Sequence, residues 1–285
     1  MLSTGETLRQ IRQSKGLTLK EVASDQLSVA FLSKVERGDS DISLGRFENL
    51  LERLRTTYDK FSFIKHNLTL SPQITFWRQV ATFVRSHNVY GLQRLYTAEK
   101  DLAANSQSPH FHNMIILHCH LCRLQSRQLP VAEVKVLHDF LFTIDSWGGY
   151  ELGVFTHAMF LFPTDELQTL TQTALKKSQV YLDLPGYHDL LATLLGNALA
   201  QLLTHHQWAA AQRISVQAQH LIDFEDLSTE KSQILLLTAW LNQQHATGAI
   251  TVPPETVIQA CYDLAAPNWS NTLYEQLTTL NHSHA

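Results

Sequence analysis

Apolar residues recur every three or four positions along almost the whole chain, which is the spacing of one face of an α-helix. Near the N-terminus this spacing predicts five short helices, and Pro72 interrupts the pattern after them. Thr18 and Glu21 have the spacing of a capping box at the start of the second helix. Gly16 and Gly38 are predicted to end the first and third helices. Since apolar and polar residues alternate over no more than about four positions, the pattern predicts an all-α protein.

The second and third helices are separated by a short connection, as in a helix-turn-helix domain. The third helix, predicted over residues 28–37, buries Leu32 and Val35 and turns its other side chains outward. Two of these outward side chains, Val29 and Phe31, are apolar, which is unusual on a solvated face but suits thymine methyl groups. We therefore predict an N-terminal helix-turn-helix DNA-binding domain. A helix-turn-helix fold used only for dimerisation is the alternative.

Beyond residue 72 the predicted helices come in pairs that repeat about every 40 residues. The first helices of the pairs are expected to begin near His110, Gly149, Tyr187 and Thr229. The second helices are expected to begin near Pro130, Pro163, Trp208 and Pro254. Proline suits the first turn of a helix, where its missing amide hydrogen is not needed. The spacing predicts an α-solenoid of tetratricopeptide-like helix pairs, and an irregular helical bundle is the alternative because the repeat consensus is absent.

The distribution of charge divides the chain near residue 66. Residues 1–66 hold 11 Lys and Arg against 9 Asp and Glu, whereas residues 67–285 hold 11 against 17. All five tryptophans and all three cysteines belong to the second part. A small basic head joined to an acidic body suggests a polyanion-binding module with a regulatory domain. We predict a DNA-binding domain over 1–66 and a helical-repeat regulatory, peptide-binding and dimerisation domain over 67–285.

Several classes of protein are disfavoured by composition and motifs. No apolar run approaches the roughly 18–20 residues of a membrane span, and the N-terminus lacks the apolar core of a signal peptide. Three cysteines suit a reducing compartment, so we expect a cytoplasmic protein with no membrane association. The motifs GxGxxG, GxSxG and HExxH are all missing, as is a P-loop. We therefore expect neither an enzyme nor a cofactor.

The segment from His118 to Cys122 is the one place where a metal ion must be considered. It contains a CxxC, but the chain has no second cysteine pair at a suitable distance to complete a site. The flanking residues predict a continuous helix, in which neighbouring side chains point to different faces. We favour a structural role for this segment and predict no metal site.

At this point the chain resembles the Rgg/GadR/MutR transcription regulators. The resemblance is strongest over LSKVERGDSDISL, residues 32–44, within a similar region over residues 3–55. Later in the chain, WGGYEL at residues 147–152 followed by Phe155 resembles the "W-x-x-YEL-x-x-F" segment of that family. The turn over residues 24–27 departs from the family because it lacks a glycine and is one residue shorter. The resemblance implies a cytoplasmic, homodimeric regulator whose helical-repeat domain senses a short peptide pheromone in quorum sensing.

Geometry assigns separate roles to the side chains of the head, in which the third helix enters the major groove of a double-stranded operator. Side chains on the outward face of that helix are candidates for reading bases: Ser28, Val29, Ala30, Phe31 and Lys34. Basic and polar side chains around it are candidates for holding phosphates: Arg9, Arg12, Lys15, Arg37 and Ser40. The Ala30 and Phe31 positions are usually polar in the family, so the operator sequence does not transfer.

The first helices of the pairs are expected to line the concave side of the solenoid, where an extended peptide needs amide partners and apolar pockets. Related peptide-sensing regulators clamp peptide backbone with asparagines, and Asn197 with Gln201 one turn later resembles that usage. Other candidates on first helices are Asn113, Tyr150, Gln233, Leu237 and Trp240. We therefore predict that the ligand is a short, hydrophobic signalling peptide. The alternative is a helix-turn-helix regulator whose helical tail is a protein–protein scaffold with no peptide pheromone.

Overall fold

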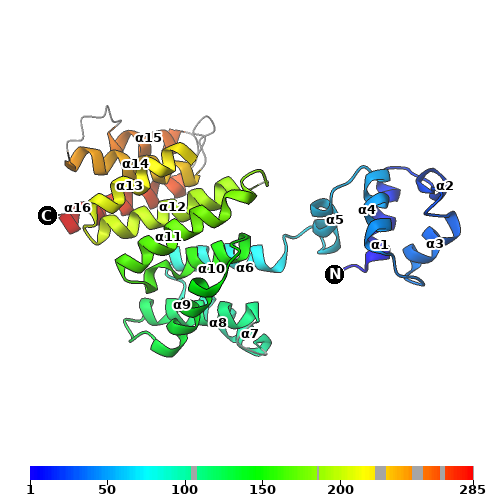
Figure 1. Ribbon diagram of the computed structural model, residues 1–285, viewed down its shortest axis with the longest axis horizontal. Coiled ribbons are helices and arrows are strands. Elements are labelled where there is room, and N and C mark those ends of the chain that lie inside the picture. The colour runs from blue at the N-terminus through cyan, green and yellow to red at the C-terminus, as the bar shows by residue number, and fades with distance from the viewer. Residues whose placement is uncertain (104–107, 185, 222–228, 246–252, 264–266, 285) are drawn as a thin grey trace. The chain divides into compact units, whose positions relative to one another are not determined.

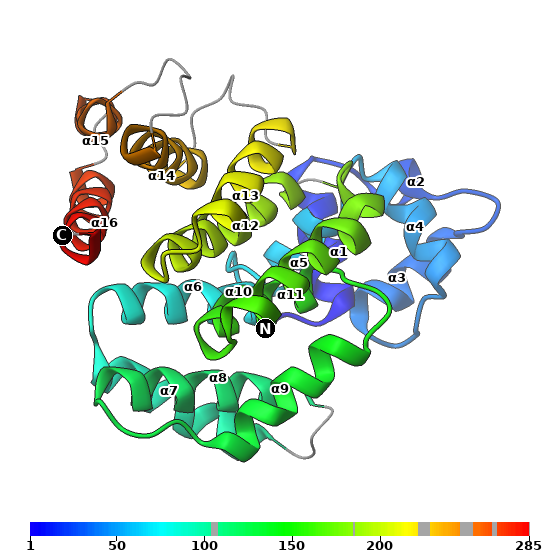
Figure 2. The same ribbon diagram turned by 60° about the vertical axis from the view of Figure 1, so that its left-hand side comes forward.

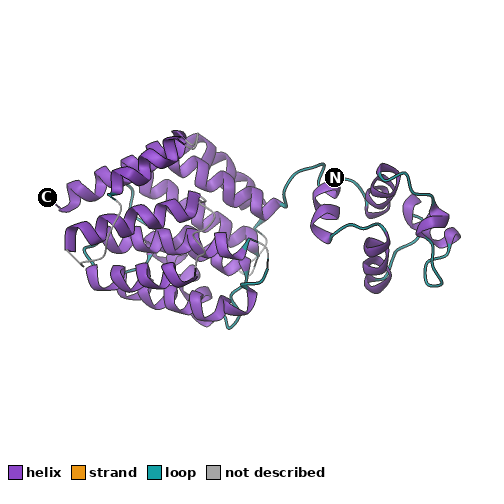
Figure 3. Ribbon diagram, turned by 90° about the horizontal axis from the view of Figure 1, so that it is seen from above, coloured by secondary structure: helices purple, strands orange, loops and turns teal. Residues whose placement is uncertain are grey.

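The computed structural model describes residues 1–103, 108–184, 186–221, 229–245, 253–263 and 267–284 (Figure 1). The chain divides into two compact units, Met1–Thr82 and Phe83–Ala285. Regular structure in the described residues is helical, with no β-strand among them (Figure 3). The predicted fold class, a helix-turn-helix head followed by a helical-repeat domain, is confirmed.

The first unit begins with five helices, as predicted. They are α1 (Thr4–Ser14), α2 (Leu19–Val22), α3 (Val29–Arg37), α4 (Leu44–Arg53) and α5 (Tyr58–Lys65). Their apolar stripes meet in one core, which includes Leu8 and Ile11 of α1, Leu32 and Val35 of α3, and Phe47 of α4. This core fixes α3 against α1, and the other face of α3 stays exposed.

The predicted helix boundaries in the head are mostly confirmed. The Thr18 hydroxyl accepts the Glu21 amide at 3.3 Å, and the Glu21 carboxylate accepts the Thr18 amide at 2.7 Å. Gly38 ends α3 with φ of +80°, in the left-handed region that glycine occupies at little steric cost. Ser43 precedes α4 at the capping position, but its side chain makes no capping hydrogen bond.

The second unit is built mainly from helix pairs. The first helices are α8 (Pro109–Leu124), α10 (Gly149–Ala158), α12 (Tyr187–Thr204) and α14 (Thr229–His245). The second helices are α9 (Val131–Thr143), α11 (Thr164–Ser178), α13 (Trp208–Leu221) and α15 (Pro254–Asp263). Short 3₁₀ turns, Met159–Leu161 and Gln179–Tyr181, follow α10 and α11. All eight starts agree closely with the sequence prediction.

The first helices follow one another through the unit. Helix α10 packs against α8 and α12, and α12 packs against α14, so these four form a continuous layer (Figure 2). Helices α11 and α13 pack against α12, and α13 and α15 pack against α14. This arrangement is the stacking expected of a solenoid, in which each repeat buries its apolar side chains against its neighbours.

Three helices were not predicted as such. Pro72, which the sequence predicts to interrupt the helical pattern, is instead the first residue of α6 (Pro72–Arg85). Proline is tolerated there because the first amides of a helix have no intrahelical partner. Helix α7 (Val89–Leu102) packs against α8, and α16 (Pro267–His284) packs against α14 and α15. Within the described residues, no helix combines the length and the apolar character needed to cross a membrane.

The stacking predicts where substitutions destabilise the second unit. Leu199 on α12 is fully buried, whereas Val180 is 80% exposed. We expect Leu199→Ala to lower the free energy of unfolding by about 2–5 kcal/mol because it removes buried apolar contacts and leaves a cavity. We expect Val180→Ala to change it by less than about 0.5 kcal/mol. Urea denaturation followed by tryptophan fluorescence measures the free energy of unfolding of both variants. Equal losses in the two variants would contradict the placement of Leu199 in the buried layer of first helices.

Candidate DNA-binding face and ligand-facing helices

Helix α3 is held in place by the turn that precedes it. Ser24 and Leu27 exchange two backbone hydrogen bonds of 3.0 Å, and the Leu27 side chain is fully buried. No residue of this turn has a positive φ, so the turn needs no glycine. This explains how the chain closes the helix-turn-helix connection without the glycine that is common at this point. The Ser28 hydroxyl then accepts the Phe31 amide at 3.2 Å and caps α3.

The predicted base-reading side chains differ in exposure. Val29 is 43% exposed, and Ser28, Ala30 and Lys34 are also exposed. Phe31 is only partly exposed, because its ring packs against the core of the head and lies 5.0 Å from the guanidinium carbon of Arg46. The free face of α3 therefore presents a hydroxyl, two small apolar side chains and one ammonium group.

The predicted phosphate-binding side chains fall into two groups. Arg9 is exposed on α1, with no hydrogen-bond or ionic partner among the described residues. Arg37 pairs with Asp39 at 2.7 Å on the surface, and Ser40 donates weakly to the Asp41 carbonyl at 3.4 Å. The Lys15 ammonium donates to the backbone carbonyls of Leu54 and Arg55. Lys15 thus also links α1 to the end of α4.

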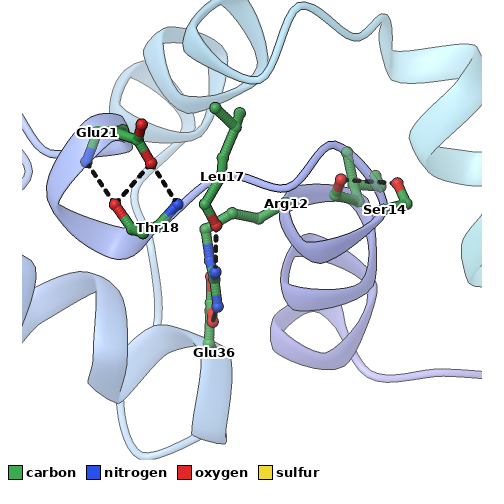
Figure 4. A network of polar contacts seen from close by, with 7 residues as sticks. Arg12, Ser14, Leu17, Thr18, Glu21 and Glu36 are labelled. Atoms are coloured by element: carbon green, nitrogen blue, oxygen red, sulfur yellow. Dashed lines mark hydrogen bonds and ion pairs between the residues drawn. The ribbon is translucent and has the colours of Figure 1, made fainter.

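Arg12, predicted to hold phosphate, is engaged inside the head (Figure 4). Its Nε and Nη2 atoms donate to the two carboxylate oxygens of Glu36 at 2.6 and 2.8 Å, and Nη1 donates to the Leu17 carbonyl at 2.6 Å. Both charged side chains are 11% exposed. The hydrogen bonds to Glu36 raise the pKa of Arg12 above its usual value. This forked pair ties α1 and the loop after it to the C-terminal half of α3.

The arrangement of Arg12 and Arg9 on one helix gives a matched pair of substitutions. We expect Arg12→Ala to destabilise the head by about 3 kcal/mol, because the Glu36 carboxylate would remain buried without its partner. Hydrogen exchange of the α1 and α3 amides measures this loss. We expect Arg9→Ala to leave exchange unchanged and to weaken binding to all DNA sequences. Unchanged protection in Arg12→Ala, with weaker DNA binding, would instead make Arg12 a phosphate contact.

In the second unit, α12 leaves one face free. From Leu190 onward, nine residues of this helix are buried against α10, α11, α13 and α14. The residues that keep some exposure lie three or four positions apart on one stripe: Leu190, Thr193, Asn197, Ala200, Gln201 and Thr204. Two predicted peptide-binding residues, Asn197 and Gln201, belong to this stripe.

The other predicted peptide-binding side chains lie at different depths. Asn113 is buried and donates to the Glu99 carboxylate at 2.9 Å. Leu237 is fully buried, as is Trp240, whose Nε1 donates to the Asn281 side chain. Tyr150 is partly exposed, and its hydroxyl lies 2.9 Å from Nδ1 of His112. Burial and the nearby carboxylates Glu151 and Glu99 raise the pKa of Tyr150.

Gln233 on α14 completes a group of three carboxamides. Its side chain is partly exposed and lies against Gly196 of α12. Asn197, Gln201 and Gln233 have no hydrogen-bond partner for their side chains within the part of the chain that the structure describes. We call these three residues the carboxamide group. Each carboxamide offers one acceptor and two donors, which is the complement of a peptide backbone.

Some residues that shape these surfaces were not predicted. Glu36 carried no signal beyond its place in the family-like motif, since its partner lies 24 positions away in the sequence. Glu99 binds both His110 and Asn113 from α7, which is not one of the predicted paired helices. Gly196 could have been noticed as a glycine within an apolar helical pattern, where alanine is more favourable. Within the His118–Cys122 segment, His118 binds Glu133 at 2.7 Å, and burial raises the pKa of Cys119 to about 12.

Comparison with known families bears directly on both units. A model described as "Helix-turn-helix" matches residues 8–61. A second model, "HTH-type transcriptional regulator Rgg, C-terminal domain", matches residues 95–247, which is more than half of the chain. The chain belongs to the Rgg family of transcriptional regulators. The matched Rgg domain begins within α7 and extends past α14, so it contains all three members of the carboxamide group.

Solved structures show the same fold over nearly the whole chain. A putative transcriptional regulator from Listeria monocytogenes EGD-e has a TM-score of 0.84 at 20% identity, covering 99% of this chain and 98% of that one. The Streptococcus dysgalactiae SHP pheromone receptor Rgg2 has a TM-score of 0.73 at 21% identity, with 96% and 98% covered. PrgX in its complex with cCF10 has a TM-score of 0.72 at 16% identity, with 99% and 94% covered.

Proposed function

We propose that this Rgg-family chain is a cytoplasmic, homodimeric transcriptional regulator whose activity responds to a short, uncharged signalling peptide. Residues 1–66 would bind the operator, and residues 67–285 would bind the peptide and form the dimer. The observation that carries the proposal is the carboxamide group, three amide side chains of α12 and α14 that have no hydrogen-bond partner among the described residues. Each of these partly exposed carboxamides can donate to and accept from the backbone of an extended chain, so the group favours a ligand with peptide bonds.

The electrostatics of the first helices support an uncharged ligand. Among the four first helices, α8, α10 and α12 together hold only three Lys, Arg, Asp or Glu residues, namely Arg123, Glu151 and Asp189, and α14 adds Glu230 and the buried Lys231. Arg123 lies 5.0 Å from the ring centre of Phe160, and Glu151 accepts the Gly148 amide. A ligand on this layer would therefore be recognised by neutral hydrogen bonds and apolar contacts. Its affinity should depend little on salt.

The layer also suggests a length for the peptide. Packed helices lie roughly 8–10 Å apart, so the three steps from α8 to α14 span roughly 24–30 Å. An extended chain advances about 3.3 Å per residue, and a peptide of about eight residues would cross this distance. The PrgX/cCF10 complex and the SHP pheromone receptor Rgg2, which share the fold, support this class of ligand by analogy.

The proposed DNA-binding mode places α3 in the major groove. One head would read too few base pairs for specificity, so two heads of a dimer would occupy half-sites about 34 Å apart or a multiple of that distance. Lys34, exposed at the middle of α3, can reach the O6 and N7 atoms of guanine. Val29 and Ala30 suit contact with thymine methyl groups. Arg9, with Arg37 and Ser40, would hold the flanking phosphates.

Substitution of Lys34 tests the base-reading role. We expect Lys34→Ala to reduce the ratio of specific to nonspecific DNA affinity, at a loss of about 1–3 kcal/mol for the specific site. Arg9→Ala serves as the control, because a lost phosphate contact should weaken all sequences alike and reduce the salt slope by about one unit. Fluorescence anisotropy with operator and scrambled duplexes at several salt concentrations measures both. Equal losses on both duplexes in Lys34→Ala would contradict the assignment.

Substitution of Asn197 tests the peptide-binding role. The ligand panel consists of fluorescein-labelled peptides of Leu, Ile, Val and Thr, about eight residues long, and polarisation reports their binding. We expect Asn197→Ala to weaken the best-binding panel member by about 1–3 kcal/mol, roughly 5–150-fold, through lost backbone hydrogen bonds. Operator affinity without peptide should change little, because Asn197 lies on α12 and α3 is in the other unit.

The outcomes separate the two hypotheses for the second unit. If the wild-type protein binds operator but no panel peptide, the peptide-sensing role is contradicted and the protein–protein scaffold is favoured. If Asn197→Ala binds the peptide as the wild type does, Asn197 is not part of the site. A lower thermal transition in that variant would instead indicate a structural role.

A further inference from the structure

Gly196 occupies an unusual place in α12. It lies in the middle of an 18-residue helix and is buried where α12 meets α14. A Cβ atom built on it would lie 3.0 Å from Oε1 and 3.3 Å from Cδ of Gln233, and 3.6 Å from Cγ1 of Ile234. The Gln233 carboxamide therefore fills the space that any other residue at position 196 would need for its side chain.

The backbone gives no reason for a glycine here. Gly196 has an ordinary helical conformation and is not among the residues with positive φ. Glycine in a helix interior is unfavourable relative to alanine, because it loses more conformational freedom on folding. The contact with Gln233 is thus the feature of this structure that alanine would disturb.

The position of Gly196 also sets where the Gln233 amide lies. Successive residues of a helix are about 100° apart, so Gly196 is on the flank of the stripe that contains Asn197. A side chain that rests on Gly196 lies at the edge of the exposed face of α12. The Gln233 carboxamide lies in the space beside Gly196. It has no hydrogen-bond partner among the described residues.

We propose that Gly196 is a positioning residue for ligand recognition: it holds the Gln233 carboxamide beside Asn197, so that the two amides bind neighbouring peptide units of the ligand. This proposal rests on the peptide-sensing function proposed above. It assigns Gln233 a direct contact with the ligand and gives Gly196 an effect that passes only through Gln233. A methyl group at position 196 would displace the carboxamide by a few tenths of an ångström and misalign its hydrogen bonds.

The test compares Gly196→Ala, Gln233→Ala and the double variant in the full-length protein. The probe is the fluorescein-labelled Leu, Ile, Val and Thr peptide that the wild type binds most tightly. We expect each single substitution to weaken binding by about two- to tenfold, the effect of one hydrogen bond. The double variant should be no weaker than Gln233→Ala, because both changes remove the same contact.

Thermal unfolding distinguishes positioning from packing. Gly196→Ala should unfold at the same temperature as the wild type or at a higher one, since alanine favours the helix. Gly45→Ala on α4 is the matched control, because nothing lies within 4 Å of its added Cβ. It should leave peptide binding unchanged.

Any of the following results would contradict the proposal. Unchanged peptide affinity in Gly196→Ala, or in Gln233→Ala, would show that the carboxamide is not held for the ligand. Additive losses in the double variant would give Gly196 an independent role. A lower unfolding temperature in Gly196→Ala would assign the glycine to helix packing. Failure of the wild type to bind any panel peptide would contradict the proposed function itself.

Discussion

Burial of the first helices against one another is the constraint on which the second unit depends. A single helix pair cannot bury its apolar side chains alone, so each pair is stable only in contact with the next. Helix α12 shows the result, because α10 and α14 cover its flanks and α11 and α13 cover a third side. From Leu190 onward, only the stripe of α12 that contains Asn197 and Gln201 keeps exposure. The packing that stabilises the fold thus also decides which residues can meet a ligand.

The head separates its basic residues in a similar way. Arg12 and Lys15 are engaged with Glu36 and with backbone carbonyls, and both connect α1 to other elements. Arg9 and Lys34 have no such partners in the described structure and remain exposed. A side chain that holds the recognition helix in place is not free to bind phosphate in the same state. Arg12, which fixes α3, and the residues proposed to contact DNA, Arg9 and Lys34, are therefore different members of one basic set.

A ligand on the first helices has a direct way to influence the rest of the molecule. Contacts to Asn197 on α12 and Gln233 on α14 come from different helices, so their strength depends on how those helices are spaced. A ligand shifts an equilibrium only between states that it binds with different affinity. Two stackings of α12 and α14 that differ in this spacing would be such a pair of states for the proposed ligand.

The sequence by itself determined the fold class, the helix-turn-helix head and the starts of the eight paired helices. These features depend on local periodicity, capping residues such as Thr18 and Ser28, and prolines at helix starts, which act over one or two turns. Only the tertiary structure decided that Arg12 pairs with Glu36, that Leu237 and Trp240 are buried, and that Gln233 rests on Gly196. A helical pattern predicts which face of a helix is apolar, but it does not specify which neighbour covers that face. The partners of these side chains lie more than 20 residues away, and their contacts form only when the helices stack.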